Sequence, residues 1–459
     1  MPHLIGLDLG TTTVTGVLLD AGRGQVLGQV QRRNDAALDS APGRAEQDPQ
    51  RLRTLALEVL AELADAGLRV DGLALTGQKH GLLCTGATGD ALTPLISWQD
   101  RRTAETGSPA TLGQLHARLA GLDWRENGCR IQHGYGAATL LWLVEQGALP
   151  AATARVCTAA DWLASQLTGQ PAVTDPTFAA SWGVYSLLDR AWNAAFLDRL
   201  RLDARLFPPV RPSGQRLGGL LPELARRVGL PGGLPVLNAL GDTQAAFLGA
   251  MVSPLLAGGT EGGLLLNLGT GGQICWAMPR FELPSEQVET RPLPGGRFLR
   301  VGASLCGGAA YAWLNCTVRA WLAEFGLELD EAAVYERLDT LAAGSEGTAG
   351  LRVRTTFLGV RGDSAVQGGA IEGITLDNLR LGALARATAM GIVDELYGLY
   401  VAHGGAGHSH IIATGGGVRK NPLLPGLIEE RFGLPVHVPS QRETAAMGAA
   451  LLAALPTDW

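Results

Sequence analysis

The chain has 459 residues, which is too long for one ordinary domain and predicts two or three domains with substantial cores. Apolar residues make up 46% of the chain and charged residues only 17%, a composition that excludes a disordered protein. The net charge of −6, without any basic run, argues against a protein that binds nucleic acid. Apolar runs are short and the N-terminus lacks a charged leader, so we expect neither a membrane segment nor a signal peptide.

The six cysteines are scattered, with no Cys-x-x-Cys pair and no histidine-rich neighbourhood. They predict neither a zinc site nor a disulfide framework, and they favour the reducing cytoplasm. We expect the chain to act as a monomer or a homodimer on small molecules.

Apolar periodicity in the first half predicts strands that alternate with helices. In chain order these are two strands within residues 4–19, a helix over 49–66, a strand over 70–76, and helices over 137–145 and 160–167. Asp175, which precedes a proline, is interpreted as a turn residue. Repeated Pro and Gly over residues 207–235 indicate connecting structure.

The second half shows the same alternation. Its predicted elements are a strand over 236–240, a helix through 248, strands over 264–268 and 273–277, helices over 309–325 and 381–401, a strand over 410–414, and a helix over 443–455. Strands that alternate with helices in both halves predict an α/β fold of two related lobes. We divide the chain into an N-terminal lobe of residues 1–235 and a C-terminal lobe of residues 236–459.

One strand–turn sequence occurs once in each half, as Leu-Asp-Leu-Gly-Thr (7–11) and as Leu-Asn-Leu-Gly-Thr (266–270). In the first copy, Gly10 allows close backbone approach, and the amides of Thr11, Thr12 and Thr13 can point into one concavity that suits a phosphate. Asp8, just before the turn, is placed to hold Mg²⁺ beside the phosphates. The same residues also suit an ordinary hairpin, and this alternative remains open for one copy alone.

The second turn, Gly269-Thr270-Gly271-Gly272, offers the same amides and hydroxyl. Two facing turns would clamp a polyphosphate from both sides. Asn267 replaces the aspartate, so the metal carboxylate would come from the first lobe only. The chain contains no Gly-x-x-x-x-Gly-Lys-Ser/Thr sequence, which excludes the common P-loop.

Three further loops are candidates for chemistry. Asp242 ends a predicted strand, where it can accept a proton from a substrate hydroxyl or act as an ordinary helix N-cap. The glycine run 415–417 can lie against a base or ribose, or form a plain turn. For a polyol, the polar candidates are Gln78, Lys79 and His80 in one loop and Trp98 and Asp100 in another. Each of these two polar segments could equally be an ordinary surface loop.

Motifs along the whole chain resemble the carbohydrate kinases known by the FGGY name, which include glycerol, xylulose, ribulose, gluconate and sedoheptulose kinases. The motifs are LIGLDLGTTTVTGVLLD (4–20), LTGQKHG (75–81), SWQDRR (97–102), ALGDTQAAFLG (239–249), NLGTGGQI (267–274), SLCGGAAYAWL (304–314), ATGGGVRKNPLL (413–424) and ETAAMGAALLA (443–453). The resemblance implies two ribonuclease-H-like lobes, the actin-like ATPase fold, with a deep cleft that closes over ATP and sugar.

The resemblance also implies roles for individual residues. Asp8 would organise Mg²⁺, Asp242 would be the general base, and Lys79 and His80 would touch the sugar. The phosphate path would be lined by Thr11, Thr12, Thr270 and Gly271, and the nucleoside by Gly308, Gly416, Gly417 and Asn421.

Many family members carry a lysine in the segment that here reads Gly-Tyr-Gly-Ala-Ala-Thr (134–139). This segment is most similar to that of the sedoheptulose kinases, as are residues 179–183 and 303–308. We therefore expect ATP-dependent phosphorylation of a primary hydroxyl of a ketose, sedoheptulose giving the 7-phosphate. The alternatives are a kinase for xylulose or another polyol, and a nucleotide-dependent interaction protein of the actin or chaperone kind.

Overall fold

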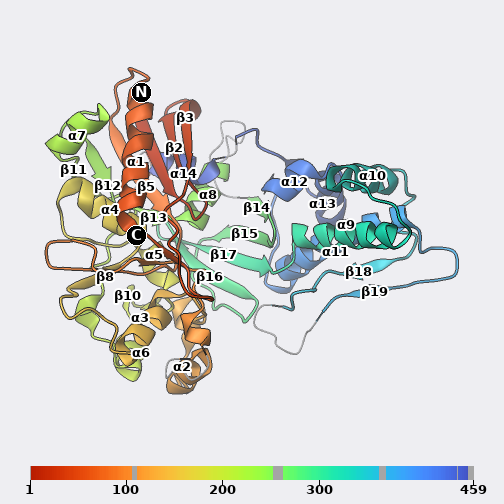
Figure 1. The fold of residues 1–459 in the computed structure, drawn as a ribbon, viewed down its shortest axis with the longest axis horizontal. Coiled ribbons are helices and arrows are strands. Elements are labelled where there is room, and N and C mark those ends of the chain that lie inside the picture. The colour runs from red at the N-terminus through yellow and green to blue at the C-terminus, as the bar shows by residue number, and fades with distance from the viewer. Residues whose placement is uncertain (1, 106–110, 252–261, 361–367, 442, 453–459) are drawn as a thin grey trace.

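The computed structural model describes residues 2–105, 111–251, 262–360, 368–441 and 443–452. Two large β-sheets lie side by side in the molecule, each covered by helices (Figure 1). The first half of the chain builds one body, coloured red to green, and the second half builds most of the other, coloured green to blue. This arrangement confirms the predicted α/β fold of two lobes.

The first sheet has the strand order β11-β12-β5-β1-β2-β3, and β13 also pairs with β5. Its strands are β1 (His3–Leu9), β2 (Thr13–Asp20), β3 (Gln25–Arg33), β5 (Gly72–Gly77), β11 (Arg216–Gly219), β12 (Pro235–Leu237) and β13 (Leu240–Gly241). β1 pairs antiparallel with β2 and parallel with β5.

Both faces of the first sheet are covered, which explains why β1 is apolar along most of its length. Ile5 and Leu7 belong to the core beneath helix α1 (Pro49–Ala64). Leu4, which points to the opposite face, packs with Ala446 and Met447 of helix α14 (Thr444–Leu452). Helix α14 of the second half therefore packs on the first sheet.

The second sheet has the order β16-β17-β15-β14-β20-β21. Its strands are β14 (Gly263–Leu268), β15 (Gly272–Met278), β16 (Val288–Leu293), β17 (Arg297–Ser304), β20 (His410–Thr414) and β21 (Val436–His437). Asp8 of β1 lies opposite Thr76 of β5, and Asn267 of β14 lies opposite Thr414 of β20, in both cases between parallel strands. The two turns that follow β1 and β14 thus occupy equivalent places in a repeated sheet.

Helices α11 (Leu381–Ala402) and α13 (Leu424–Phe432) pack against the second sheet, and α9 (Gly308–Glu324) and α10 (Glu331–Ala343) pack against α11 (Figure 1). The remaining α-helices of the described residues are α2 (Leu112–Arg118), α3 (Gly136–Glu145), α4 (Ala159–Thr168), α5 (Pro176–Ser181), α6 (Ala194–Leu200), α7 (Pro222–Val228), α8 (Asp242–Met251) and α12 (Gly416–Lys420). Short 3-10 helices lie at Arg102–Ala104, Trp124–Asn127 and Ala204–Leu206. Paired short strands complete the fold: β4 (Glu46–Gln47) with β7 (Leu95–Ile96), β6 (Leu83–Thr85) with β8 (Arg155–Cys157), β9 (Tyr185–Ser186) with β10 (Ala191–Trp192), and β18 (Arg352–Arg354) with β19 (Ala370–Glu372).

Helices α8 and α14 pack side by side between the two sheets (Figure 1). Glycines let their backbones touch. A Cβ on Gly448 would lie 1.8 Å from the carbonyl oxygen of Ala245, and a Cβ on Gly249 would lie 2.0 Å from that of Thr444. The chain leaves the first sheet through α8 and returns to it through α14. The glycine contact between these two helices therefore helps to fix the position of the two bodies relative to each other.

Some expectations about chain organisation were wrong. Residues 235–241 do not open the second lobe, because β12 and β13 pair with β5 of the first sheet. The stretch 207–235 is not only connecting structure, since it contains β11 and α7. Asp175 is the N-cap of α5 rather than a simple turn residue. Residues 453–455 of the predicted last helix lie outside the described residues. No helix within the described ranges is long and apolar enough to cross a membrane.

Candidate active site

A cavity of about 710 Å³ lies between the two sheets, at the start of α8. Its wall includes residues of helices α8 and α14 and of the second sheet. The lining residues are Asp242, Thr243, Ala246, Leu265, Asn267, Gln273, Cys275, Thr414, Gly415, Gly416, Arg419, Lys420, Thr444 and Ala445. The cavity thus lies beside the C-terminal ends of parallel strands, where α/β folds bind ligands.

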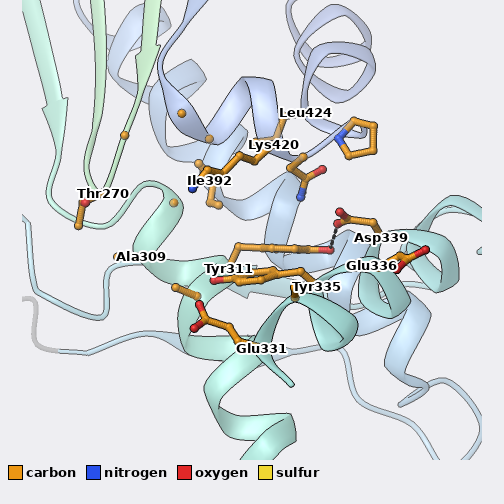
Figure 2. Close-up of a pocket in the computed structure, with 18 of the residues that line it drawn as sticks. Thr270, Ala309, Tyr311, Glu331, Tyr335, Glu336, Asp339, Ile392, Lys420 and Leu424 are labelled. Atoms are coloured by element: carbon orange, nitrogen blue, oxygen red, sulfur yellow. Dashed lines mark hydrogen bonds between the residues drawn. The ribbon is translucent and has the colours of Figure 1, made fainter. Parts of the chain in front are cut away.

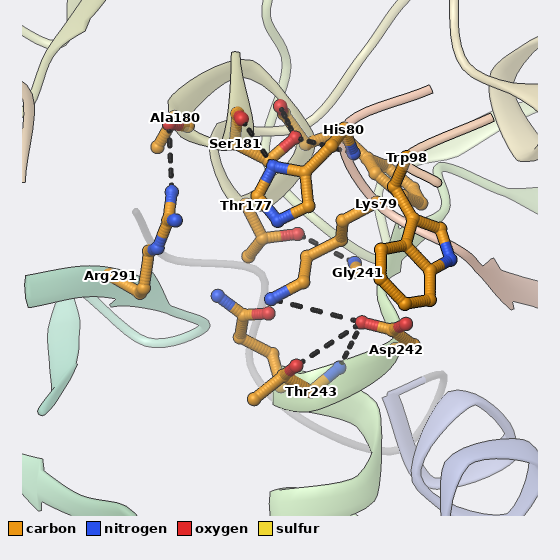
Figure 3. A network of polar contacts seen from close by, with 12 residues as sticks. Lys79, His80, Trp98, Thr177, Ala180, Ser181, Gly241, Asp242, Thr243 and Arg291 are labelled. Carbon is orange, nitrogen blue, oxygen red and sulfur yellow. Dashed lines mark hydrogen bonds and ion pairs between the residues drawn. The ribbon is translucent and has the colours of Figure 1, made fainter. Parts of the chain in front are cut away.

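Asp242 is the first residue of α8 and faces this cavity. Its side chain is 41% exposed, and its Oδ1 lies 3.8 Å from Nζ of Lys79. The same oxygen accepts hydrogen bonds from the amide and the hydroxyl of Thr243, at 2.6 and 3.2 Å. Asp242 is therefore both a local cap and an accessible carboxylate (Figure 3).

The loop after β5 carries Lys79 and His80. Burial lowers the pKa of Lys79, and the neighbouring Asp242 carboxylate opposes that effect. His80 has φ of 71°, in the left-handed region that few residues other than glycine adopt. Its amide donates to Oγ of Ser181, and its ring stacks on Tyr135 at 4.1 Å between centroids. A strained residue held by so many contacts is common in binding sites.

His80 is held as a neutral ring. Burial lowers its pKa well below the usual value, and the charges of Arg291 and Lys79 lower it further. Its Nδ1 lies 2.6 Å from the carbonyl oxygen of Ser181. A carbonyl only accepts, so Nδ1 carries the proton and Nε2 is left as an acceptor.

Arg291 lies behind His80 and is almost completely buried. Its guanidinium donates to Glu289, to the hydroxyl of Tyr135 and to the carbonyl oxygen of Ala180, at 2.7, 3.1 and 2.9 Å. Tyr135 in turn donates to Glu289 at 3.1 Å. These contacts join β16 of the second sheet to α5 and to the segment before α3.

The second polar loop links the first turn to this region. Nε1 of Trp98 donates to Oγ1 of Thr11 at 2.9 Å. Asp100 is buried, and its oxygens accept from the amides of Ala45 and Arg102 and from the guanidinium of Arg102. Asp100 thus anchors its loop, and its contact with a sugar stays a prediction.

Gln78 is also buried. Its amide bonds the carbonyl oxygen of Leu9, and its Nε2 donates to Gln47 at 2.9 Å. It ties the loop of Lys79 to the end of β1.

Asp8 lies near the cavity with its Oδ1 buried and without a hydrogen-bond partner among the described residues. Burial raises the pKa of Asp8 to about 7, and the negative charges of Asp242 and Glu443 add to that effect. A cation beside Asp8 would stabilise the ionised form of this buried carboxylate, so Asp8 fits as a ligand of Mg²⁺. No group of three or more His, Cys, Asp or Glu side chains in the described ranges is arranged to hold a metal, so phosphate and water oxygens would have to complete the shell.

A larger cavity of about 1460 Å³ lies in the second body (Figure 2). Tyr311 and Tyr335 stack within it at 6.2 Å, and the Tyr311 hydroxyl donates to Asp339 at 2.8 Å. Its lining residues are Gly269, Thr270, Gly308, Ala309, Tyr311, Ala312, Asp330, Glu331, Ala332, Tyr335, Glu336, Asp339, Thr340, Ala343, Ile392, Gly416, Gly417, Lys420, Asn421, Pro422 and Leu424. The two cavities share Gly416 and Lys420, so one long ligand can reach from this pocket to Asp242.

The glycines at the junction are needed for close packing. Gly415 has φ of 95°, and a Cβ there would lie 2.4 Å from the carbonyl oxygen of Leu268. The amide of Gly308, where α9 begins, donates to the carbonyl oxygen of Gly269 at 2.9 Å. The second turn, α9 and the glycine run therefore meet at one point.

Half of the predicted residues lie in two groups. Thr270, Gly308, Gly416, Gly417 and Asn421 line the larger cavity. Asp242, Lys79 and His80 lie together (Figure 3). The walls of the two cavities do not include Thr11, Thr12, Thr13 or Gly271 among the described residues, although Trp98 connects Thr11 to the sugar loops.

Sequence reasoning missed Tyr135, Arg291, Tyr311, Tyr335 and Asp339. The helical spacing around Tyr311 and Tyr335 did not distinguish them from core residues. The start of α5 had a signal in Asp175-Pro176, because Asp at the N-cap followed by Pro marks a helix N-terminus.

A sheet repeated in this strand order, with an equivalent turn in each copy and a large cavity between helices of the second body, defines a two-lobed protein of the actin-like ATPase fold. Residues 3–249 match the N-terminal domain of the FGGY family of carbohydrate kinases, and residues 264–456 match its C-terminal domain. The chain belongs to this family and is an ATP-dependent carbohydrate kinase, which transfers a phosphoryl group to an alcohol.

Three relatives illustrate the range of similarity. A sedoheptulokinase of Mus musculus is 29% identical over 98% of this chain and 97% of its own length. A glycerol kinase of Thermus brockianus is 32% identical over 98% of this chain and 89% of its own length. The crystal structure of xylulose kinase from Rhodospirillum rubrum superposes with a TM-score of 0.85 at 26% identity, covering 98% of this chain and 89% of that one. Family membership decides against an interaction protein that lacks a small substrate.

Proposed function

We propose that this kinase transfers the γ-phosphoryl group of ATP to a primary hydroxyl of a ketose, and that sedoheptulose is converted to sedoheptulose 7-phosphate. Support for the sugar comes from two relatives named sedoheptulokinase, from Mus musculus and Homo sapiens, each 29% identical over 98% of this chain. The similarity spans nearly the whole chain.

The position of Asp242 carries the proposal. Its carboxylate is accessible from the cavity between the sheets and lies beside the loop of Lys79 and His80. There it accepts the proton of the attacking hydroxyl as the oxygen bonds to phosphorus. Nζ of Lys79 lies 3.8 Å from this carboxylate.

This loop offers sugar hydroxyls both a hydrogen-bond acceptor and a hydrogen-bond donor. Nε2 of neutral His80 can accept a hydrogen bond from a sugar hydroxyl, and Nζ of Lys79 can donate one. Gln78, Trp98 and Asp100 complete the proposed sugar-binding set, with Gln78 and Asp100 acting through the loops that they anchor.

The nucleotide would run from the large cavity to Asp242. Gly308, Gly416, Gly417 and Asn421 would surround the nucleoside, with the buried Nδ2 of Asn421 as a donor for the base. The phosphates would be held at the two turns by Thr11, Thr12, Thr13, Thr270 and Gly271. Mg²⁺, when bound at Asp8, would supply charge that offsets the developing negative charge on the phosphate oxygens.

Asp242→Asn tests this mechanism. The amide keeps the shape and the bond from the Thr243 amide but cannot take a proton, so we expect ATP binding to be nearly unchanged and turnover to fall by about 10²–10⁴-fold. ATP affinity by calorimetry and kcat by a coupled ADP assay separate the two effects. Near-normal turnover in the variant would remove Asp242 from the role of general base.

Xylulose is the second candidate acceptor, because a xylulose kinase of known structure shares the fold over 98% of this chain at 26% identity. A panel of ketoses and polyols, compared by kcat/KM at saturating ATP, separates the two. Xylulose used as well as sedoheptulose, or better, would overturn the sedoheptulose assignment without affecting the kinase assignment.

A further inference from the structure

The short helix α5 contacts Gly241, the residue before the proposed base, at one end and the loop of His80 at the other (Figure 3). Asp175 caps its N-terminus and is fully buried. Its carboxylate accepts hydrogen bonds from the amide of Phe178 at 2.9 Å, from the hydroxyl of Ser213, and from the hydroxyl of Thr177 at 2.8 and 2.9 Å. With both oxygens occupied, Asp175 is rigidly held.

The hydroxyl of Thr177 has its direction determined by Asp175. Burial raises the pKa of Asp175 to about 6, so at neutral pH the carboxylate is ionised and only accepts. The Thr177 proton must therefore point to Asp175, which leaves the Thr177 oxygen as an acceptor. That oxygen receives the amide N–H of Gly241 at 2.7 Å.

Gly241 is the residue immediately before Asp242, at the point where β13 becomes α8. The amide plane that Thr177 holds therefore helps to set the backbone direction from which the Asp242 side chain leaves. Charge-assisted chains of this kind restrict geometry more strongly than isolated neutral bonds.

The other end of α5 contacts the sugar loop. Oγ of Ser181 accepts a hydrogen bond from the His80 amide, and the carbonyl oxygen of Ser181 accepts one from the His80 ring. The carbonyl oxygen of Ala180 accepts a hydrogen bond from Arg291. One helix of six residues thus contacts both Gly241, next to the proposed base, and His80, the proposed sugar ligand.

We propose that Thr177, oriented by Asp175, is a positioning residue that holds the Asp242 carboxylate in line with the acceptor hydroxyl. This inference rests on the proposed function, in which Asp242 takes the proton. Through α5, the base and His80 are held at a fixed separation, so the acceptor hydroxyl is placed against both at once.

Thr177→Val removes the hydroxyl and keeps the shape, whereas Thr177→Ser keeps the hydroxyl. We expect kcat to fall roughly 10- to 100-fold in the valine variant, because misplacement by about 1 Å has effects of that size. The KM for ATP should stay within about twofold, and the serine variant should recover most of the turnover. Equal kcat in the valine variant and the wild type would overturn the proposal.

Thr168→Val is the matched control. Thr168 is also buried, and its hydroxyl donates to the carbonyl oxygen of Ala164 within α4 at 2.8 Å. It lies outside the site, so this variant should lose thermal stability to a similar extent while keeping wild-type kcat. A similar fall of kcat in both variants would show a general effect of losing a buried hydroxyl and would overturn the positioning role.

A double-mutant cycle separates failure of the inference from failure of the proposed function. In an Asp242→Asn background, Thr177→Val should lower the residual turnover no further, because there is no base left to position. A loss of the same factor in both backgrounds would show that Thr177 acts independently of Asp242 and would overturn the inference. Near-normal turnover of Asp242→Asn alone would instead refute the proposed base.

Discussion

The close contact of α8 and α14 makes Gly448→Ala a sensitive test of how the two bodies are joined. An added Cβ would lie 1.8 Å from the carbonyl oxygen of Ala245, whereas real Cβ contacts are essentially never shorter than 3.0 Å. The obstacle is backbone, which cannot rotate away. The helices must therefore separate by roughly 1 Å.

The free-energy change combines two effects. Overpacking of this kind costs about 1–3 kcal/mol, and the better helix propensity of alanine returns at most about 1 kcal/mol. We expect a net loss of about 1–2 kcal/mol in the free energy of unfolding. Turnover should fall by about tenfold or more, because Asp242 begins α8 and Thr444 of α14 lines the same cavity.

Urea unfolding and steady-state kinetics measure both effects. Gly426→Ala is the control, because Gly426 lies in α13 with no atom within 4 Å of the added Cβ. The control should be equal to the wild type in kcat and up to about 1 kcal/mol more stable. A Gly448→Ala protein with wild-type stability and turnover would refute the close packing of α8 and α14.

Three further predictions follow from individual contacts. Burial raises the pKa of Asp161 to about 7, so the folded state binds this proton more tightly than the unfolded state, and stability present below about pH 4 is lost as the pH rises to 7. Asp161→Asn removes that loss. Relative to wild type, the variant should therefore gain about 1–3 kcal/mol in free energy of unfolding, measured by urea unfolding, between pH 5 and pH 8. A difference between variant and wild type that is the same at both pH values would contradict this. Trp98→Phe removes the hydrogen bond to Thr11, worth about 1 kcal/mol, and should raise the KM for ATP about fivefold; an unchanged KM would show that Thr11 does not contact the nucleotide. Asp8→Asn should weaken binding of Mn²⁺, a paramagnetic substitute for Mg²⁺, to the ADP complex by tenfold or more in electron paramagnetic resonance titrations, and equal binding would remove Asp8 from the metal site.

Local patterns were enough to predict the strands and turns that repeat. Apolar alternation and the Leu-Gly-Thr turn identified β1 with β2 and β14 with β15, and the strand over residues 410–414 is confirmed to the residue as β20. These elements are encoded within a few residues, so a single sequence reveals them.

Pairing between distant segments was not predictable in the same way. β12 and β13 follow a proline- and glycine-rich stretch and could open either lobe, and only their hydrogen bonds to β5 place them in the first sheet. Local sequence carries no record of which strand will be the neighbour.

The site shows the same division. Asp8, Asp242 and Lys79 stand in recognisable motifs, whereas Arg291 and Tyr135 are isolated in the sequence and meet only because β16 packs against α5. Asp175 also had a local signal, but its contact with Ser213 depends on a chain reversal that no local pattern describes.

The most direct test of the central claim is identification of the product by ³¹P nuclear magnetic resonance after incubation with ATP, Mg²⁺ and sedoheptulose. The proposed function predicts ADP formation that depends on the sugar, and one new phosphomonoester on the terminal hydroxyl. The Asp242→Asn protein should form that product at least about 100-fold more slowly. ATP hydrolysis at the same rate without sugar, or a phosphate on a different hydroxyl, would contradict the account.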